Sequence, residues 1–176
     1  MQLPTRERIL DAFQNLVIES GERAATLDAV AQRAGVSKGG LLYHFGSKEA
    51  LIEGLTDRLL GLVDADTALM RADPAGPIDY FVRTSVSMEG DLDQAIVAAA
   101  RLAQGAHPAA RDALKAAQAE WLKVLAETVH DPAIARTIML IGDGIYYNSS
   151  MGAGSLSAQE MNELVATVHR LADSAP

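Results

Sequence analysis

One short stretch near the N-terminus, TLDAVAQRAGVSKGGLLYHFGSK over residues 26–48, combines basic, hydroxyl and aromatic side chains. Its polar groups suit hydrogen bonding to phosphate oxygens rather than bond-breaking chemistry. Four of its side chains can reach phosphates: Lys38, Tyr43, His44 and Lys48. A histidine such as His44 is more often an ordinary surface residue when taken alone, so its role depends on the surrounding pattern.

The same stretch contains the signals for two short helices that would position these side chains. Thr26 predicts the start of the first helix as its N-cap, and Gly35 predicts its end. Ser37 predicts the start of the second helix, and its hydroxyl can also face a phosphate. Two short helices separated by a glycine-containing turn indicate a helix-turn-helix, whose second helix lies in the major groove of DNA.

Two adjacent glycines, Gly39 and Gly40, lie inside the second of these helices. Each costs about 1 kcal/mol relative to Ala in a helix interior. This cost is understandable where another backbone approaches closely, so we expect both glycines to lie against DNA.

The distribution of charge also places a DNA contact in the first quarter of the chain. The 176 residues carry a formal net charge of −8, which argues against nucleic-acid binding when it is averaged over the chain. Residues 1–48, however, hold six Lys and Arg against five Asp and Glu, and the remaining 128 residues hold a net charge of −9. The acidic remainder would be kept away from a polyanion.

The composition predicts a cytoplasmic protein of one or two small domains without membrane contact. The chain contains no cysteine, which fits a reducing compartment. Charged residues near the N-terminus interrupt any signal peptide, and the longest apolar run, residues 95–100, is far below the ~18 residues that span a bilayer.

Patterns typical of enzymes and metal sites are weak. Glu127 and His130 have the Glu-x-x-His spacing of di-iron bundles, but the sequence contains no second such pair. Gly142-Asp-Gly144 follows no predicted strand, so it does not form a phosphate loop. We therefore expect no enzyme, no metal site and no cofactor.

Helical periodicity recurs along the chain, whereas strand alternation does not. The expected fold is all-α, with an N-terminal helix-turn-helix domain over residues 1–47 and a ligand-binding and dimerisation bundle over residues 48–176, linked by the helix that begins at residue 48. About nine helices are expected, at residues 5–20, 27–34, 38–45, 48–70, 78–88, 92–104, 108–129, 132–151 and 157–173.

Residues 5–60 resemble the tetracycline-repressor (TetR) family of bacterial transcription regulators. The matching positions are Ala34–Gly39, Leu41, His44, Phe45 and Ser47–Leu51. The resemblance implies phosphate contacts for Thr26, Ser37, Tyr43, His44 and Lys48. This chain departs from the family pattern at Gly40 and Leu42, so base readout should depend less on side-chain hydrogen bonds, with Leu42 able to touch a thymine methyl. The resemblance also implies a homodimer in which the last two helices pack against their two-fold mates.

The C-terminal part combines aromatic and polar residues in apolar surroundings. Such mixtures line small-molecule pockets, although an apolar stripe with scattered aromatics is also typical of an ordinary core. The single tryptophan, Trp121, needs a partner for its indole N–H if it is buried. An apolar stripe on the last helix, which includes Leu164 and Val168, is expected to meet a second subunit. The residues expected to bind a ligand are Met88, Trp121, Met139, Asp143, Tyr147 and Asn148.

These inferences favour a homodimeric DNA-binding transcriptional regulator. We expect a repressor that a small, largely apolar inducer releases from a palindromic operator, because ligand binding alters the spacing of the two recognition helices. One alternative is a helical small-molecule-binding or catalytic protein whose N-terminal helices are only scaffold. Another is a DNA-binding regulator that responds to a protein partner instead of a ligand.

Overall fold

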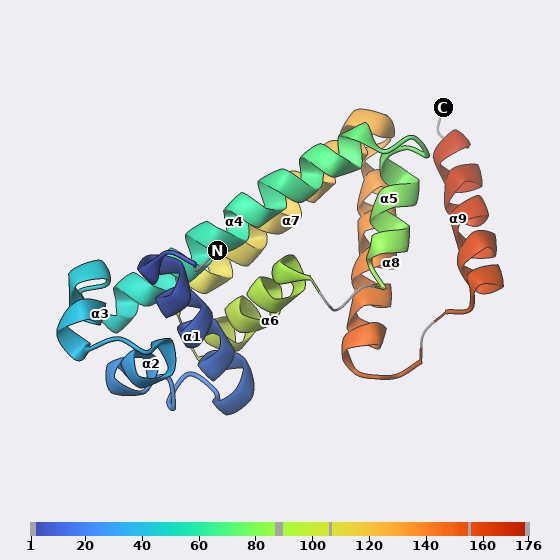
Figure 1. Cartoon of the computed structure of the whole chain (residues 1–176). Helices are drawn as coiled ribbons and strands as arrows, with labels where there is room; N and C mark the ends of the chain where they lie inside the picture. The colour runs from blue at the N-terminus through green and yellow to red at the C-terminus, as the bar shows by residue number, and fades with distance from the viewer. Residues whose placement is uncertain (1–2, 87–89, 106, 155, 175–176) are drawn as a thin grey trace. The chain divides into compact units, whose positions relative to one another are not determined.

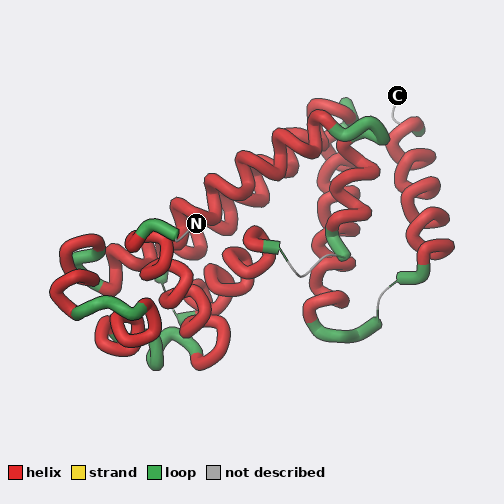
Figure 2. The backbone as a smooth tube through the Cα atoms, in the orientation of Figure 1, coloured by secondary structure: helices red, strands yellow, loops and turns green. Residues whose placement is uncertain are grey.

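The computed structural model describes residues 3–86, 90–105, 107–154 and 156–174. Over these ranges the chain forms nine α-helices and no strand, which confirms the expected all-α class (Figures 1 and 2). None of the described helices is long and apolar enough to cross a membrane. The helices are α1 (Thr5–Ser20), α2 (Leu27–Ala34), α3 (Lys38–His44), α4 (Lys48–Ala72), α5 (Pro77–Thr84), α6 (Asp91–Gln104), α7 (Pro108–Thr128), α8 (Pro132–Ser150) and α9 (Ala158–Asp173).

The chain folds into two compact units, and the boundary expected at residues 47 and 48 falls inside the first of them. Unit 1 comprises Met1–Leu62 and Asp91–Ala116, and unit 2 comprises Val63–Gly90 and Ala117–Pro176. Helices α4 and α7 each contribute residues to both units. The expected boundary was placed from the order of motifs along the chain, whereas these units reflect which helices lie close together in space.

The core of unit 1 joins α1 to helices that are close and distant in sequence. Apolar residues of α1 at helical spacing, among them Ile9 and Phe13, are fully buried. They share one cluster with Leu41 of α3 and with Leu102 of α6. Because α6 completes this cluster, it belongs with the N-terminal helices rather than with the C-terminal bundle.

The core of unit 2 is built by α5, α8 and α9 with the adjoining parts of α4 and α7. Helix α9 begins at a capping box, in which the Ser157 hydroxyl accepts from the Glu160 N–H and the Glu160 carboxylate accepts from the Ser157 N–H. The apolar stripe of α9 faces this core, and Val168 is only 1% exposed. Val168 was expected to meet a second subunit; it packs inside its own chain instead, because α5 and α8 cover it.

Helix α5 is shorter than the predicted segment 78–88. It ends at Thr84, where the Thr84 hydroxyl donates to the Tyr80 carbonyl and the Ser85 hydroxyl donates to the Phe81 carbonyl. Hydroxyl side chains compete with the backbone ladder in this way and favour helix ends. Met88, one of the expected ligand-binding residues, lies outside the described residues.

Candidate nucleic-acid interface

The turn between α2 and α3 has the local geometry that its residue types predict. The Thr26 hydroxyl accepts from the Ala29 N–H at 3.2 Å and caps α2. Gly35 ends α2 in the left-handed region, with φ 66° and ψ 38°. The Ser37 hydroxyl accepts from the Gly40 N–H at 3.0 Å and caps α3. These contacts set the direction in which α3 leaves the turn.

Side chains of α1 and α4 hold this helix pair in place. The Arg8 guanidinium of α1 donates to the Ala34 carbonyl at 2.7 Å, satisfying a carbonyl at the end of α2. After α3, Phe45 adopts an extended conformation and is 3% exposed. A Cβ added at Gly54 of α4 would stand 2.8 Å from the Phe45 ring. Glycine at this position therefore lets the backbone of α4 pack closely against that ring.

Helix α3 presents an exposed face that carries most of the expected DNA-contacting side chains. Leu41 is fully buried, whereas Leu42 and Tyr43 are 40% and 86% exposed. Nothing lies within 4 Å of a Cβ built at Gly39, so its surface is open to another backbone. The residues exposed on this face are Lys38, Gly39, Leu42, Tyr43 and His44.

The two lysines of the motif have different environments. Lys38 is exposed and forms a surface ion pair with Asp28 of α2 at 2.9 Å. Lys48 is half-buried and donates at 2.6 Å both to the Glu22 carbonyl and to the Glu22 carboxylate. The hydrogen bond from Lys48 lowers the pKa of Glu22 and keeps this carboxyl ionised. Lys48 therefore ties the start of α4 to the loop that follows α1, a contact with no local signal in the sequence.

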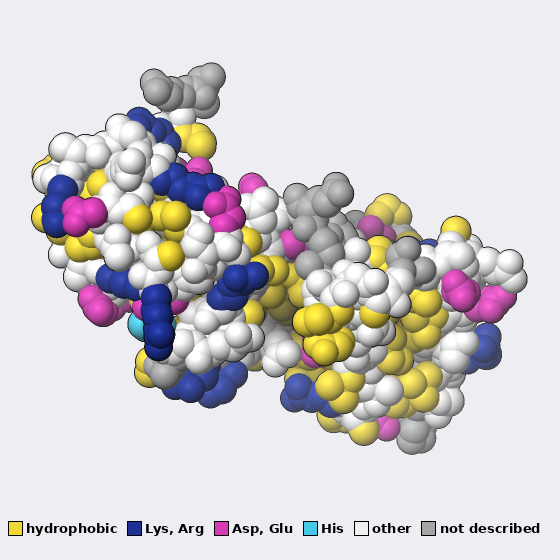
Figure 3. Space-filling view, turned by 90° about the horizontal axis from the view of Figure 1, so that it is seen from below, with side chains coloured by type: hydrophobic (Ala, Val, Ile, Leu, Met, Phe, Trp, Pro, Cys, Tyr) yellow, Lys and Arg dark blue, Asp and Glu magenta, His cyan; other side chains and the backbone are white. Residues whose placement is uncertain are grey.

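On the face drawn in Figure 3, Lys and Arg side chains are more frequent over unit 1, and the broader hydrophobic areas lie over unit 2, with smaller ones over unit 1. Among the described residues, no group of three or more His, Asp or Glu is arranged to hold a metal ion.

The expected ligand-binding residues of unit 2 fall in two different environments. The Trp121 indole N–H donates to one carboxylate oxygen of Asp66 at 2.8 Å, and the Tyr80 hydroxyl donates to the other at 2.8 Å. Burial of the Tyr80 phenol and its bond to Asp66 raise its pKa. Met139 is 1% exposed within the core of unit 2. Asp66 was not expected at this site, and nothing in the sequence distinguishes it from the other carboxylates of the amphipathic helix α4.

The remaining expected ligand residues lie further along α8. Asp143 is partly buried, and loss of hydration raises its pKa. The Gln118 amide donates to this carboxylate at 3.3 Å. Tyr147 is 61% exposed and Asn148 is also exposed, which places both on the outer surface of α8 in a single chain.

Comparison with known proteins agrees with this arrangement of helices. Residues 9–55 match the family of bacterial regulatory proteins called tetR, and residues 76–173 match the tetracyclin repressor-like C-terminal domain. The chain belongs to the TetR family. Its helix pair α2 and α3 lies within the first of these matched regions, and α5 to α9 make up the second.

Individual relatives of this TetR-family chain include regulators and a drug-binding protein. The transcriptional regulator UidR of Escherichia coli is 38% identical over 89 residues, which are 48% of this chain and 43% of UidR. Salmonella enterica GusR has a TM-score of 0.73 at 23% identity, covering 97% of this chain and 96% of GusR. The multidrug binding protein EbrR, solved with malachite green, has a TM-score of 0.66 at 24% identity, covering 94% and 96% of the two chains. The match to UidR therefore spans less than half of that relative.

Proposed function

We propose that this chain is a homodimeric transcriptional repressor that binds a palindromic DNA operator through α3 and is released by a small, largely apolar inducer. The observation that carries the proposal is the exposed face of α3. An aromatic side chain that is 86% exposed, as Tyr43 is, contributes nothing to the core of unit 1. On a helix-turn-helix, this face is the one that enters the major groove.

A stripe of exposed residues on α8 supports dimer formation. Leu140, Gly144 and Tyr147 of α8 and Met151, which directly follows the helix, stand at helical spacing and are all exposed. Leu140, Tyr147 and Met151 are 61%, 61% and 64% exposed. Large apolar side chains grouped on one helix face indicate an interaction surface, and two-fold symmetric copies would present two α3 helices to two operator half-sites.

The environment of Trp121 supports an inducer site in unit 2. Trp121, Tyr80 and Asp66 combine two aromatic rings with one carboxylate, a mixture found in small-molecule sites. The structural relative EbrR is described as a multidrug binding protein. An apolar inducer that binds here is expected to change Trp121 fluorescence over the concentrations at which it releases DNA.

The DNA-binding proposal can be tested with two substitutions at one ion pair. The probe is a DNA duplex selected by the wild-type protein from a random library, and affinity is measured by fluorescence anisotropy at several salt concentrations. Lys38→Ala should weaken binding and flatten the salt dependence, because one phosphate contact is lost. Asp28→Ala should not weaken binding, because it releases Lys38 and removes a negative charge near DNA.

The pair of variants separates a DNA contact from a structural role. If Lys38 mattered only through its ion pair with Asp28, both substitutions would weaken binding to the same extent. Tyr43→Ala should also weaken binding while the circular dichroism spectrum and the unfolding midpoint stay unchanged. Unchanged affinity in both Lys38→Ala and Tyr43→Ala would contradict the assignment of α3.

A further inference from the structure

A cavity of about 500 Å³ in unit 1 shares no lining residue with the exposed face of α3 or with the Trp121 site. Helices α1, α4 and α6 and the segment before α1 supply its walls. Two leucines, Leu3 and Leu62, contribute apolar surface, and the other lining residues are polar. The polar lining residues are Glu7, Asp11, Gln14, Asn15, Arg58, Asp91 and Gln94.

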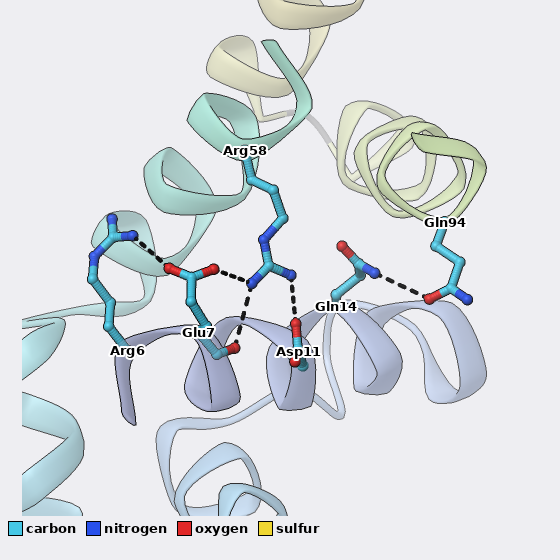
Figure 4. Close-up of polar contacts among 6 residues, drawn as sticks. All are labelled: Arg6, Glu7, Asp11, Gln14, Arg58 and Gln94. Carbon is cyan, nitrogen blue, oxygen red and sulfur yellow. Dashed lines mark hydrogen bonds and ion pairs between the residues drawn. The ribbon is translucent and has the colours of Figure 1, made fainter. Parts of the chain in front are cut away.

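One buried amide in this cavity has an unmatched hydrogen-bond acceptor. Gln14 is only 6% exposed, and its side-chain N–H donates to the Gln94 amide oxygen at 3.2 Å. Its own Oε1 atom is buried and has no hydrogen-bond partner among the described residues. Figure 4 shows this oxygen directed into the space between Arg58 and Gln94, both of which line the cavity. A buried carbonyl oxygen is costly without a donor, so a ligand here should bring an N–H or O–H group.

The charges of the cavity indicate which kind of donor fits. Three carboxylates line it, from Glu7, Asp11 and Asp91, against a single guanidinium, from Arg58. The Arg58 guanidinium is divided between two of these carboxylates: it donates to Glu7 and to Asp11 at 2.7 Å each (Figure 4). The lining therefore keeps a net negative charge, which favours a cationic donor over a neutral or anionic one.

We propose that the cavity between α1, α4 and α6 binds a small organic ammonium ion, such as a primary alkylamine. The ammonium group donates to the Gln14 carbonyl oxygen, and the carboxylates of the lining offset its charge. The alkyl chain lies against Leu3 and Leu62. This site is separate from the inducer site proposed around Trp121 and needs no DNA for occupancy.

The test is titration of the full-length, DNA-free protein with n-butylammonium chloride, followed by NMR of the Gln14 side-chain amide and by equilibrium dialysis. Two control compounds separate charge from donor capacity: tetramethylammonium is a cation without N–H groups, and 1-butanol is a donor without charge. We expect saturable butylammonium binding with a dissociation constant on the order of 1 mM. Both control compounds should bind at least about tenfold more weakly.

Three variants complete the test. Gln14→Leu removes the acceptor at similar volume and should weaken butylammonium binding about tenfold or more. Asp91→Asn changes an exposed residue at the start of α6, so the fold is retained while a lining charge is lost and binding weakens. Gln159→Leu makes the same amide-to-leucine change at an exposed position of α9 and should leave binding unchanged.

Several outcomes would overturn the proposal. They are the absence of saturable binding, equal binding of tetramethylammonium, and unchanged affinity in both Gln14→Leu and Asp91→Asn. The effect of occupancy on operator affinity is a separate measurement that rests on the proposed function: Arg8 connects α1 to the end of α2, so occupancy should alter DNA affinity. Because butylammonium binding is measured without DNA, its failure and the failure of the DNA-binding proposal are distinguishable.

Discussion

Two glycines of the helix-turn-helix stand in opposite situations, and their substitution by alanine should have opposite effects on stability. Gly35 has a positive φ of 66°, so Gly35→Ala should cost about 1–2 kcal/mol of unfolding free energy. Gly39 lies inside α3 with open space around it, so Gly39→Ala should gain about 0.5–1 kcal/mol. Urea denaturation measures both values.

The same pair of variants tests why α3 contains glycine. Gly39→Ala should weaken DNA binding although it stabilises the fold, because the added methyl group lies where a DNA backbone approaches. Gly35→Asn is the control for the left-handed conformation at Gly35. Because asparagine tolerates this conformation, the Gly35→Asn protein should lose less stability than the Gly35→Ala protein. A Gly39→Ala protein that is more stable and binds DNA as tightly as the wild type would show that the glycine has no role in binding.

At the level of elements, Arg58 joins α4 to α1 and makes the packing of these helices sensitive to pH. Its hydrogen bond lowers the pKa of Glu7 below the ordinary value of 4.5. Because the folded pKa is depressed, the stabilisation is complete above about pH 4.5 and is lost as the pH falls through the folded pKa. Glu7 is 38% exposed, so the contribution at neutral pH is on the order of 1 kcal/mol or less.

Glu7→Gln should therefore reduce the free energy of unfolding at pH 7, and its difference from the wild type should shrink below pH 4.5. The measurement is urea denaturation at pH values from 3 to 7. In the background of Arg58→Met, the effect of Glu7→Gln should largely disappear, since the partner is absent. A Glu7→Gln effect of equal size with and without Arg58 would assign it to some other contact.

Helices α8 and α9 make different contributions to the proposed dimer. Leu140→Glu places a charge on the exposed stripe of α8 and should convert the dimer into a folded monomer, which sedimentation velocity detects together with loss of operator binding. Val168→Glu places a charge in the core of unit 2 and should unfold that unit instead. A wild-type protein that sediments as a monomer at micromolar concentration would contradict the dimer.

Local elements could be predicted from the sequence, whereas partnerships between distant residues could not. Thr26, Gly35 and Ser37 act on the backbone within a few positions of themselves, so their residue types were sufficient to predict the ends of α2 and the start of α3. The end of α3 was predicted less well. Phe45 was expected in the helix over residues 38–45 but is extended, because its ring reaches the core beside α4.

The candidate sites show the same division. The exposed face of α3 follows from helical periodicity, since Leu41 is buried and its neighbours are not. The contacts of Lys48 with Glu22 and of Trp121 with Asp66 join residues far apart in the chain, and no periodicity indicates them. The burial of Gln14 against α6 likewise depends on the packing of α1 against a helix that begins at Asp91.

At the scale of the whole molecule, unit 1 depends on a helix that the chain reaches only after it has passed through part of unit 2. Leu102 of α6 is fully buried in the core that contains α1, so Leu102→Ala should destabilise unit 1 by about 2–5 kcal/mol. Hydrogen exchange should show reduced protection of α1 amides. Val165→Ala in α9 is the matched control and should reduce protection in α5 and α8 instead.

The division of unit 1 into Met1–Leu62 and Asp91–Ala116 also has a consequence for the order of synthesis. A ribosome releases the helix-turn-helix before α6 exists, and at bacterial elongation speeds α6 and the start of α7 follow on the order of several seconds later. During this interval the apolar face of α1 has no α6 to cover it, so the nascent chain exposes surface that chaperones recognise. A chimeric regulator made by exchanging residues 1–62 alone would therefore place a foreign α1 against the α6 of this chain.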